Sequence, residues 1–445
     1  MERSKNFMKK KITLIGALFF LVFLVLMGRL VYLMVFQSQY YSQKAEDIEE
    51  RERDIKAARG RLIDANGKIL ATNETVCTVS VIHSQITDAD AVTDMLVKEL
   101  GLTEEEATAA YDADMAQLHA DRGDSYGGGD AAGLDYDAYE KPKFENNVMP
   151  GTVKALYLNN EAIRNPEAYI AVADGCGINA FVVDVMDGGA IGYASPVMQQ
   201  YSPSAYEDAY NTLEDYQAAV KKLKDSGYYV IGRITAFNDP NLAADHPECV
   251  VADLSGRPLK IGGMYWPSVY SRDVWQYKVD LALEAARTMG FNEIQFDYVR
   301  FPDGTWGYDE AGTIDYRNTN DESKAQAVQR FLQYAADRLH EAGVYVSADV
   351  FGECAEKYVT AYGQYWAAIS GVVDAISAMP YPDHYSASGS WLPWEHPYET
   401  MKTFGEKAAA RQQETPSPAA VRTWIQCYNA IREPYNTYGP EEVGA

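Results

Sequence analysis

The sequence predicts an α/β fold over the last two thirds of the chain, a barrel of parallel strands and helices of the (β/α)8 type. From residue 151 onward, short β-rich runs alternate with amphipathic helical stretches. The runs are almost continuously apolar, which is typical of parallel strands covered on both faces. Gly227, Gly290 and Gly343 each stand between a helical stretch and the next run, where helix C-caps are expected.

Seven strands are expected, at residues 153–159, 180–185, 229–235, 293–297, 344–349, 373–379 and 422–427. Helices are expected between them, for example at residues 213–226, 274–289, 324–342 and 397–411. This repetition suits a barrel better than an open doubly wound sheet, and no Gly-rich phosphate loop follows the first run. The pattern ends within the seventh helix, so we expect a barrel that lacks its last strand, either because the polypeptide is truncated or because something else closes it.

The N-terminus has the pattern of a membrane anchor. Residues 12–28 carry no charge, and after Arg29 the apolar run resumes over residues 30–36. This length is enough to cross a hydrocarbon core of ~30 Å. Lysines and arginines precede the run, which predicts a cytoplasmic N-terminus. A cleaved signal peptide is the alternative, but the run is long and no small-x-small site follows it. We therefore expect residues 1–37 to be a cytoplasmic tail and transmembrane helix, with the rest of the chain extracellular.

Residues 38–120 are expected to form a stalk and a small pedestal. Asn66-Gly67 predicts a hairpin turn between two short strands. Arg59-Gly60, Asp64-x-Asn66-Gly67 and Leu70-Ala71-x-Asn73 resemble the membrane-proximal segment of class B penicillin-binding proteins. The transpeptidase motifs S-x-x-K and K-T-G do not occur, so the resemblance implies an assembly module and cell-wall assembly proteins as partners, not catalysis. A generic hairpin beside the membrane remains the alternative.

Composition narrows the chemistry. The formal net charge of −25 argues against a nucleic-acid partner, because phosphates repel an acidic surface. The five cysteines include no CxxC pair, so neither a zinc site nor a disulfide framework is indicated. No His/Asp cluster has metal-ligand spacing, and we expect no metal and no cofactor. Residues 121–150 are rich in Gly, Asp and Tyr, which predicts a flexible linker before the barrel at 151–445.

Polar residues recur at the carboxyl ends of the expected strands, where barrel enzymes hold their active sites. Side-chain alternation turns Gln295 and Asp297 into the lumen and Ile294 and Phe296 toward the helices. The same argument turns inward Ser347 and Asp349, Arg233 and Thr235, Tyr157 and Asn159, and Trp424 and Gln426. Two carboxylates on neighbouring strands are the requirement for glycosidic bond cleavage. A structural network of Asp297 with Arg233 or Arg300 is the alternative.

Five motifs resemble those of a bacterial family of glycosyl-hydrolase barrels: residues 183–188, 232–237, 296–302 (Phe-Asp-Tyr-Val-Arg-Phe-Pro), 346–352 and 379–385. The resemblance covers about residues 152–430 and implies a barrel related to carbohydrate-active enzymes. By analogy with amylase-like barrels it makes Asp297 the nucleophile and Asp349 the general acid, with Glu353 as the reserve acid. The chain departs from the family at Asp383, where a serine is common before His-Tyr.

Nine residues are expected to bind substrate: Asp184, Arg233, Gln295, Tyr298, Arg300, Tyr381, His384, Trp424 and Gln426. His384 could equally be a surface group, and Asp187 is expected in a loop. Aromatic residues of the barrel loops could stack on sugar rings or could only pack: Tyr265, Trp266, Trp306, Trp391 and Trp394.

The leading hypothesis is a membrane-anchored glycoside hydrolase that acts on an extracellular or cell-envelope polysaccharide. The alternative is a non-catalytic glycan-binding or envelope-scaffold protein. A third hypothesis is a metal-dependent enzyme that modifies polysaccharides with Asp297 and Asp349 as ligands. The separation and accessibility of these two carboxylates should discriminate among them.

Overall fold

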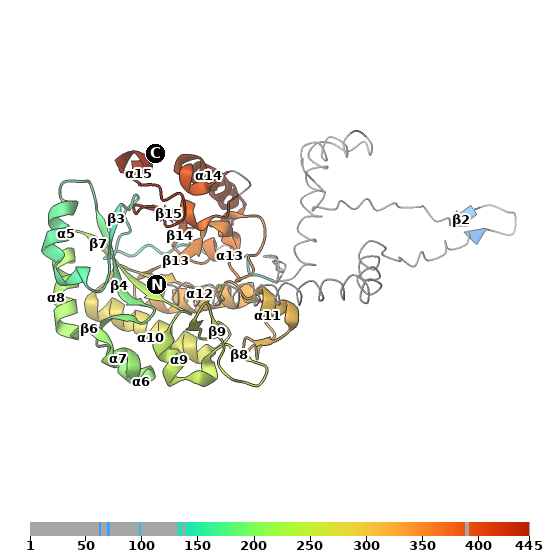
Figure 1. The fold of residues 1–445 in the computed structure, drawn as a ribbon, viewed down its shortest axis with the longest axis horizontal. Coiled ribbons are helices and arrows are strands. Elements are labelled where there is room, and N and C mark those ends of the chain that lie inside the picture. The colour runs from blue at the N-terminus through green and yellow to red at the C-terminus, as the bar shows by residue number, and fades with distance from the viewer. Residues whose placement is uncertain are drawn as a thin grey trace, which may run out of the picture. The chain divides into compact units, whose positions relative to one another are not determined.

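The computed structural model describes residues 62–63, 69–71, 98, 131, 133–136, 139–387 and 391–444 (Figure 1). Two units are distinguished, Met1–Val79 and Ser80–Ala445. In the first, β1 (Leu62–Ile63) pairs antiparallel with β2 (Ile69–Ala71), which confirms the hairpin expected around Asn66-Gly67. Within the described ranges no helix has both the length and the hydropathy to cross a membrane. The expected anchor at residues 12–36 lies outside those ranges.

A parallel sheet forms the centre of the second unit. Its strands lie in the order β15-β14-β13-β11-β7-β4-β3, and each neighbouring pair is parallel. The bounds are β3 (Ala155–Leu158), β4 (Ala180–Asp187), β7 (Tyr229–Thr235), β11 (Glu293–Asp297), β13 (Tyr345–Phe351), β14 (Ala375–Met379) and β15 (Ala420–Thr423). All seven expected strands are therefore found, β7 and β11 to the residue. β15 begins two residues earlier than expected and ends before Trp424.

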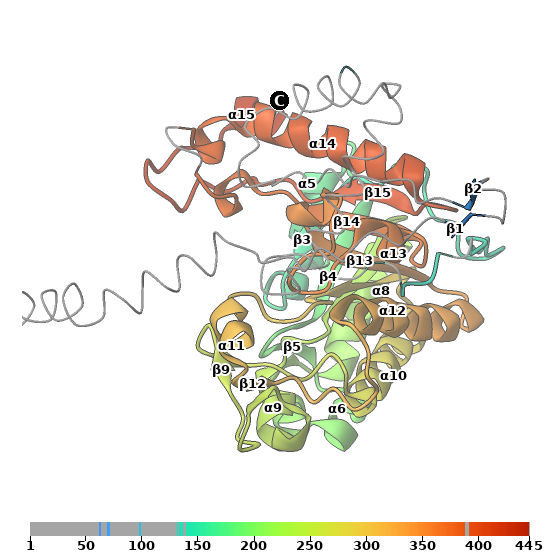
Figure 2. The same cartoon turned by 90° about the vertical axis from the view of Figure 1, so that its right-hand side faces the viewer.

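A helix follows each strand and lies on the outside of the sheet (Figures 1 and 2). These helices are α5 (Pro166–Ala173), α8 (Leu213–Asp225), α10 (Arg272–Met289), α12 (Lys324–Glu341), α13 (Trp366–Ser370), α14 (Pro397–Glu414) and α15 (Pro440–Gly444). Their ends follow from local chemistry. Ser323 and Gln326 form a capping box at the start of α12. Gly290 ends α10 with a φ of 77°, a left-handed conformation that glycine adopts without strain.

Short elements enlarge the loops at the carboxyl end of the sheet. After β4 come β5 (Ala190–Tyr193), α6 (Pro196–Tyr201), α7 (Pro203–Glu207) and β6 (Ala209–Asn211). After β7 come α9 (Pro240–Asp245), β8 (Ala252–Asp253), β9 (Lys260–Ile261) and β10 (Met264–Tyr265). After β11 come α11 (Trp306–Ala311) and β12 (Ile314–Asp315), and β12 pairs with β8. The 3₁₀ turns are η3 (Ala162–Arg164), η4 (Pro247–Cys249), η5 (Gly352–Ala355), η6 (Pro382–His384) and η7 (Pro393–Glu395).

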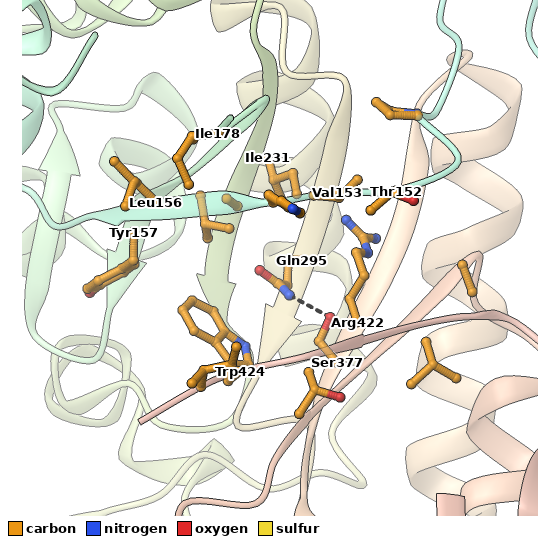
Figure 3. A pocket seen from close by; sticks show the side chains of 18 of the residues that line it. Thr152, Val153, Leu156, Tyr157, Ile178, Ile231, Gln295, Ser377, Arg422 and Trp424 are labelled. Carbon is orange, nitrogen blue, oxygen red and sulfur yellow. Dashed lines mark hydrogen bonds between the residues drawn. The ribbon is translucent and has the colours of Figure 1, made fainter. Parts of the chain in front are cut away.

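The two faces of the sheet have separate cores. Ile294, Phe296, Val346 and Ala348 belong to the large core under the helices, which confirms the predicted alternation. The opposite face carries a smaller apolar cluster: Ala180, Val182, Tyr229, Ile231 and Tyr345. β3 and β15, the first and last strands of the order, line one cavity of about 680 Å³ (Figure 3). The sheet therefore curls until its two edges flank the same space, and the described residues supply no strand between them.

The end of the expected linker, residues 139–150, is attached to the sheet, which corrects the prediction of a flexible linker for this part. We call these residues the strap. Lys141 Nζ donates to the backbone carbonyls of Ser370 (3.1 Å) and Gly371 (2.8 Å). Asn147 Nδ2 donates to the carbonyls of Asn292 (2.7 Å) and Gly343 (2.9 Å), just before β11 and β13. The Phe144 ring packs on Tyr345, with centroids 4.8 Å apart. Burial of this ring favours a fixed path that composition alone does not reveal.

Candidate functional site

Four carboxyl groups converge on one arginine at the carboxyl end of the sheet. We call this group the Arg233 cluster; it consists of Arg233, Asp184, Asp187, Asp297 and Asp349. Arg233 Nη1 lies 2.8 Å from Asp184 Oδ1 and 3.3 Å from Asp187 Oδ1. Nη2 lies 2.5 Å from Asp297 Oδ2, and Nε lies 3.6 Å from Asp349 Oδ2. Arg233 is 8% exposed, so these charges meet away from bulk water and attract strongly.

Strand register sets this convergence. Phe296 pairs with Ala348, so the next residues, Asp297 and Asp349, end β11 and β13 at the same level. Asp297 pairs with Thr235 on the other side. The chain then turns at Tyr298, whose φ of 49° is in the left-handed region that non-glycine residues rarely adopt. Tyr298 N donates to Asp297 Oδ1 at 2.5 Å. Backbone strain directly after a buried carboxylate is typical of functional sites.

Asp349 is enclosed and asymmetrically bonded. Its Oδ1 accepts hydrogen bonds from Gln295 Nε2 and Trp424 Nε1, both at 2.8 Å. Its Oδ2 is buried and accepts no hydrogen bond from any residue that the structure describes. Burial, and then the charge of Asp297, raise the pKa of Asp349 well above its usual range. Asp349 therefore binds a proton more readily than an ordinary carboxyl group does. It lies beside Asp297, which faces two donors, Arg233 and the Tyr298 N–H.

Asp184 is the second perturbed carboxyl group. Burial raises its pKa to about 6, against the opposing effects of Arg233 and of a hydrogen bond from Tyr157. The Tyr157 hydroxyl donates to Asp184 Oδ2. Its ring meets the Trp424 ring edge-on, with centroids 5.8 Å apart. Tyr157 is 41% exposed and thus marks an open side of the cluster.

Asp187 is a member of the cluster that sequence reasoning missed. It was expected in a loop, but it is the last residue of β4, and its side chain is 43% exposed. The register of β4 against β7 shifts between Asp184 and Met186. Such a bulge breaks strict alternation and lets Asp184 and Asp187 turn to the same face. Strict alternation along β4 therefore predicts that Asp184 faces the lumen, but it does not predict this for Asp187.

Glu353 and Arg300 lie in other networks. Glu353, in η5, accepts from Tyr358 (3.0 Å) and Tyr362 (2.8 Å), and its described contacts are not with the Arg233 cluster. Arg300 donates to Asp303 at 3.0 Å, and its guanidinium lies 4.4 Å from the centre of the Phe351 ring. The structural network expected as an alternative therefore exists through Arg233 and not through Arg300.

The remaining expected residues lie around a second carboxylate, Asp383. Asp383 Oδ1 bonds His384 Nδ1 at 2.6 Å, and Gln426 Nε2 donates to Oδ2 at 2.9 Å. The Tyr381 ring contacts the His384 ring, with centroids 5.2 Å apart. Burial raises the pKa of Tyr381 strongly, and the charges of Asp349 and Asp297 raise it further. Tyr381 follows β14, whose Ser377 pairs with Asp349 on β13, so this group lies at the same end of the sheet as the Arg233 cluster.

Among the candidate aromatic platforms, Trp266 and Trp394 are buried, whereas Trp306 and Trp391 are well exposed. Trp391 stacks on His396, with centroids 3.8 Å apart. Lys260 Nζ lies over the Tyr265 ring, 5.0 Å from the ring centre. Exposure leaves Trp306 and Trp391 as the faces that a sugar could reach.

Residues that bond members of the cluster line the cavity between β3 and β15 (Figure 3). Gln295 and Trp424, the two donors to Asp349, line it together with Tyr157. Deeper in the lumen, Arg422 Nη2 bonds Glu293 Oε1 at 2.6 Å. Tyr229 and Ser347 also donate to Glu293. We call this group the Arg422 layer; Glu293 was not expected to face the lumen with partners. Thr235 Oγ1 instead accepts from Gly188 N, and Asn159 Oδ1 caps the turn at Ala162 N.

The described residues contain no group of three or more His, Cys, Asp or Glu placed to hold a metal ion. The centre of the four carboxyl groups is taken by the Arg233 guanidinium. Its charge stands where a cation would stand, so these residues do not favour the hypothesis of Asp297 and Asp349 as metal ligands.

Comparison with known proteins gives matches to both parts of the chain. The model of a family described as "Putative glycosyl hydrolase domain" matches residues 155–445. The chain belongs to this family. Residues 54–169 match the model of the penicillin-binding protein dimerisation domain. The chain is similar to peptidoglycan D,D-transpeptidase MrdA of Acinetobacter baumannii, with 29% identity over 105 residues, 24% of this chain and 16% of that protein. It thus spans a small part of that relative.

Two solved structures are also similar. A hypothetical protein from Ruminiclostridium thermocellum is 31% identical, with a TM-score of 0.37, and the match covers 44% of this chain and 97% of that one. The PgaB (BpsB) glycoside hydrolase domain of Bordetella bronchiseptica is 14% identical, with a TM-score of 0.38, and the match covers 58% and 81%. Family membership and the strand order identify an α/β domain of the glycosyl hydrolase kind.

Proposed function

We propose that the protein is a glycoside hydrolase that cleaves an extracellular or cell-envelope polysaccharide at the Arg233 cluster. The observation that carries this proposal is the enclosed carboxyl group of Asp349, whose pKa is raised, beside Asp297 at the carboxyl end of a parallel sheet. Carboxyl groups held in different protonation states are the requirement for acid-assisted glycosidic cleavage. Membership of the glycosyl hydrolase family supports the same reaction class.

In this proposal Asp349 gives its proton to the leaving glycosidic oxygen, and Asp297 attacks the sugar carbon or activates water. Arg233 orients both groups and holds Asp184 beside them. Gln295 and Trp424 fix Asp349 Oδ1 and leave the proton on Oδ2. Tyr298, Tyr381, His384 and Gln426 surround the entrance, where hydroxyl groups of a sugar would bind. The proposal keeps Arg300 as a substrate-binding residue and Glu353 as the reserve acid, although their described contacts lie outside the Arg233 cluster.

The proposed architecture is a (β/α)8-type barrel in which the place of the eighth strand is the cavity between β3 and β15. A transmembrane helix at residues 12–36 would hold the barrel outside the cell. The match to the penicillin-binding protein dimerisation domain supports association with the cell envelope and with cell-wall assembly proteins.

A second candidate function is a non-catalytic glycan-binding or scaffold protein. The observation in its favour is that Arg233 forms ion pairs with both proposed catalytic carboxyl groups, which are almost fully buried. A salt-bridged pair of this kind also occurs in purely structural networks. The two functions differ in whether a bound glycan is cut.

Hydrolysis of a panel of bacterial polysaccharides separates the two candidates. Asp297→Asn and Asp349→Asn should each lower kcat by about 10²–10⁴-fold, the usual contribution of a positioned acid or base. Asp225→Asn, on an exposed ion pair with Lys221, is the matched control and should leave kcat unchanged. A glycan that is bound but not cut by the wild type would establish the scaffold. Full activity of Asp297→Asn would remove the proposed nucleophile.

A further inference from the structure

A histidine and a buried aspartate form a pair next to the proposed catalytic carboxyl groups. Asp383 and His384 lie in η6, directly after β14. His384 Nδ1 is 2.6 Å from Asp383 Oδ1. The ring of His384 contacts the ring of Tyr381, which lies within the electrostatic field of Asp349 and Asp297. The pair therefore lies at the same end of the sheet as the Arg233 cluster, because Ser377 of β14 pairs with Asp349 of β13.

Asp383 is held more firmly than a loop carboxylate needs to be. It is 1% exposed, and its Oδ2 accepts from Gln426 Nε2 (2.9 Å) and from the backbone N–H of Ile431 (3.2 Å). Tyr428 also forms a hydrogen bond with it. These donors come from the segment after β15, so two separate loops fix one carboxylate. Burying a carboxylate is costly unless such partners surround it.

This environment fixes the orientation and tautomer of His384. An ionised carboxylate only accepts hydrogen bonds, so Nδ1 must carry the proton. Nε2 is then the basic nitrogen, and no residue in the described ranges forms a hydrogen bond with it. The His384 side chain is 47% exposed. The other titratable or charged groups at this position are Tyr381, Tyr428 and Arg432, the last bonded to the Tyr385 carbonyl.

We infer that His384 is a proton-transfer residue of the proposed hydrolase and that Asp383 is its positioning residue. The inference rests on the proposed function. The proton of a water molecule or sugar hydroxyl passes to Nε2, the O–H electron pair stays on oxygen, and the imidazolium formed later returns the proton to solvent. Asp383 stabilises the imidazolium without itself taking the proton. His384 is suited to this step because Asp297 and Asp349 are almost enclosed, whereas its own ring is open to solvent.

The chain contains a matched control, the pair His340 and Asp374. His340 Nε2 lies 2.7 Å from Asp374 Oδ2, and that oxygen also accepts from Val346 N. Asp374 precedes β14, and His340 lies near the end of α12, so this pair is at the opposite end of the sheet. It is also a hydrogen-bonded pair of a histidine and a buried aspartate, but it lies away from the proposed site.

The first test is the pH dependence of kcat/KM on whichever glycan the wild type cleaves. His384→Gln should lower kcat about 10–100-fold, leave KM within about threefold and abolish one limb of the profile. Asp383→Asn should shift that limb, while His340→Gln should leave the profile unchanged. A profile of His384→Gln that equals the wild-type profile would overturn the inference. Asp297→Asn would still be inactive in that case, so the proposed function would survive.

The second test does not need turnover. With six histidines in the chain, ¹⁵N-histidine NMR can resolve the His384 ring by its absence in His384→Gln. The expected spectrum shows the proton on Nδ1 in the wild type, a mixture of tautomers in Asp383→Asn and a shift of Nε2 on addition of a bound oligosaccharide. A proton on Nε2 in the wild type, or no shift with a saturating oligosaccharide, would contradict the assignment even if no glycan were hydrolysed.

Discussion

Two arginines on the lumen side of the sheet, one buried and one half-buried, have different charge environments. Arg422, in the deeper layer, meets one carboxylate, Glu293, which also accepts from Tyr229 and Ser347. Arg233, at the carboxyl end, meets four carboxyl groups. The deeper layer is charge-balanced, as a structural ion pair is. The upper layer has four carboxyl groups around one arginine, and burial together with the charge of Asp297 raises the pKa of Asp349. Charge imbalance rather than burial therefore distinguishes the proposed site.

Replacing each arginine by methionine tests this comparison most severely. Arg233→Met leaves four carboxyl groups without their cation and should cost more than the about 3–5 kcal/mol typical of a broken buried pair. Arg422→Met leaves Glu293 with two neutral donors and should cost less. Part of the loss in Arg233→Met should be recovered at low pH, where the carboxyl groups are protonated.

Urea denaturation measures both free energies of unfolding. Arg257→Met, in an exposed ion pair with Asp253, is the control and should change stability by about 0–1 kcal/mol. An Arg422→Met variant that is less stable than Arg233→Met would contradict the predicted difference between the two layers.

The pH dependence of stability sharpens the comparison. Burial raises the pKa of Asp184 from 3.8 to about 6, so the folded protein holds this proton more tightly than the unfolded chain does. The resulting stability is complete below about pH 3.8 and is lost as pH rises through 6, a loss of about 3 kcal/mol. Asp184→Asn should flatten the stability profile between pH 4 and 6, whereas Glu293→Gln should not. Parallel profiles of wild type and Asp184→Asn would exclude this cause.

The smallest expected effect is that of Trp424→Phe. This change keeps an aromatic ring against Tyr157 but removes the N–H that donates to Asp349 Oδ1. The loss of one such hydrogen bond should cost about 1 kcal/mol of stability. It should also raise the pKa of Asp349 further, because that hydrogen bond lowers it. In kcat/KM the basic limb should move to higher pH, and Tyr398→Phe, at an exposed ring on α14, provides a control.

Periodicity predicted the sheet well, because strands buried on both faces are apolar throughout and glycines mark the preceding helix ends. Alternation also predicted which side of β11 and β13 bears Gln295, Asp297 and Asp349. It failed at Asp187, because a bulge in β4 shifts the alternation by one residue. The short elements of the carboxyl-end loops were not predicted, since two to six residues carry no recognisable period.

Other residues were missed because their partners are far away in the chain. Glu293 stands at the start of a strand, and only folding brings Arg422 against it across 129 positions. Asp383 resembles an ordinary loop aspartate until Gln426 and Ile431 enclose it. Glu353 was named as the reserve acid by analogy with amylase-like barrels, and in the structure η5 turns it toward Tyr358 and Tyr362. The catalytic roles of Asp297 and Asp349 stay predictions until hydrolysis is measured.

The strap determines where a shortened fragment of this chain should begin. A fragment that starts at Gly151 would keep every strand but would strip Phe144 from Tyr345 and Asn147 from the carbonyls of Asn292 and Gly343. The apolar cluster that contains Tyr345 would then be more exposed to water. A shortened fragment should therefore begin before Leu134, whose side chain is itself buried, so that the strap stays attached to the sheet.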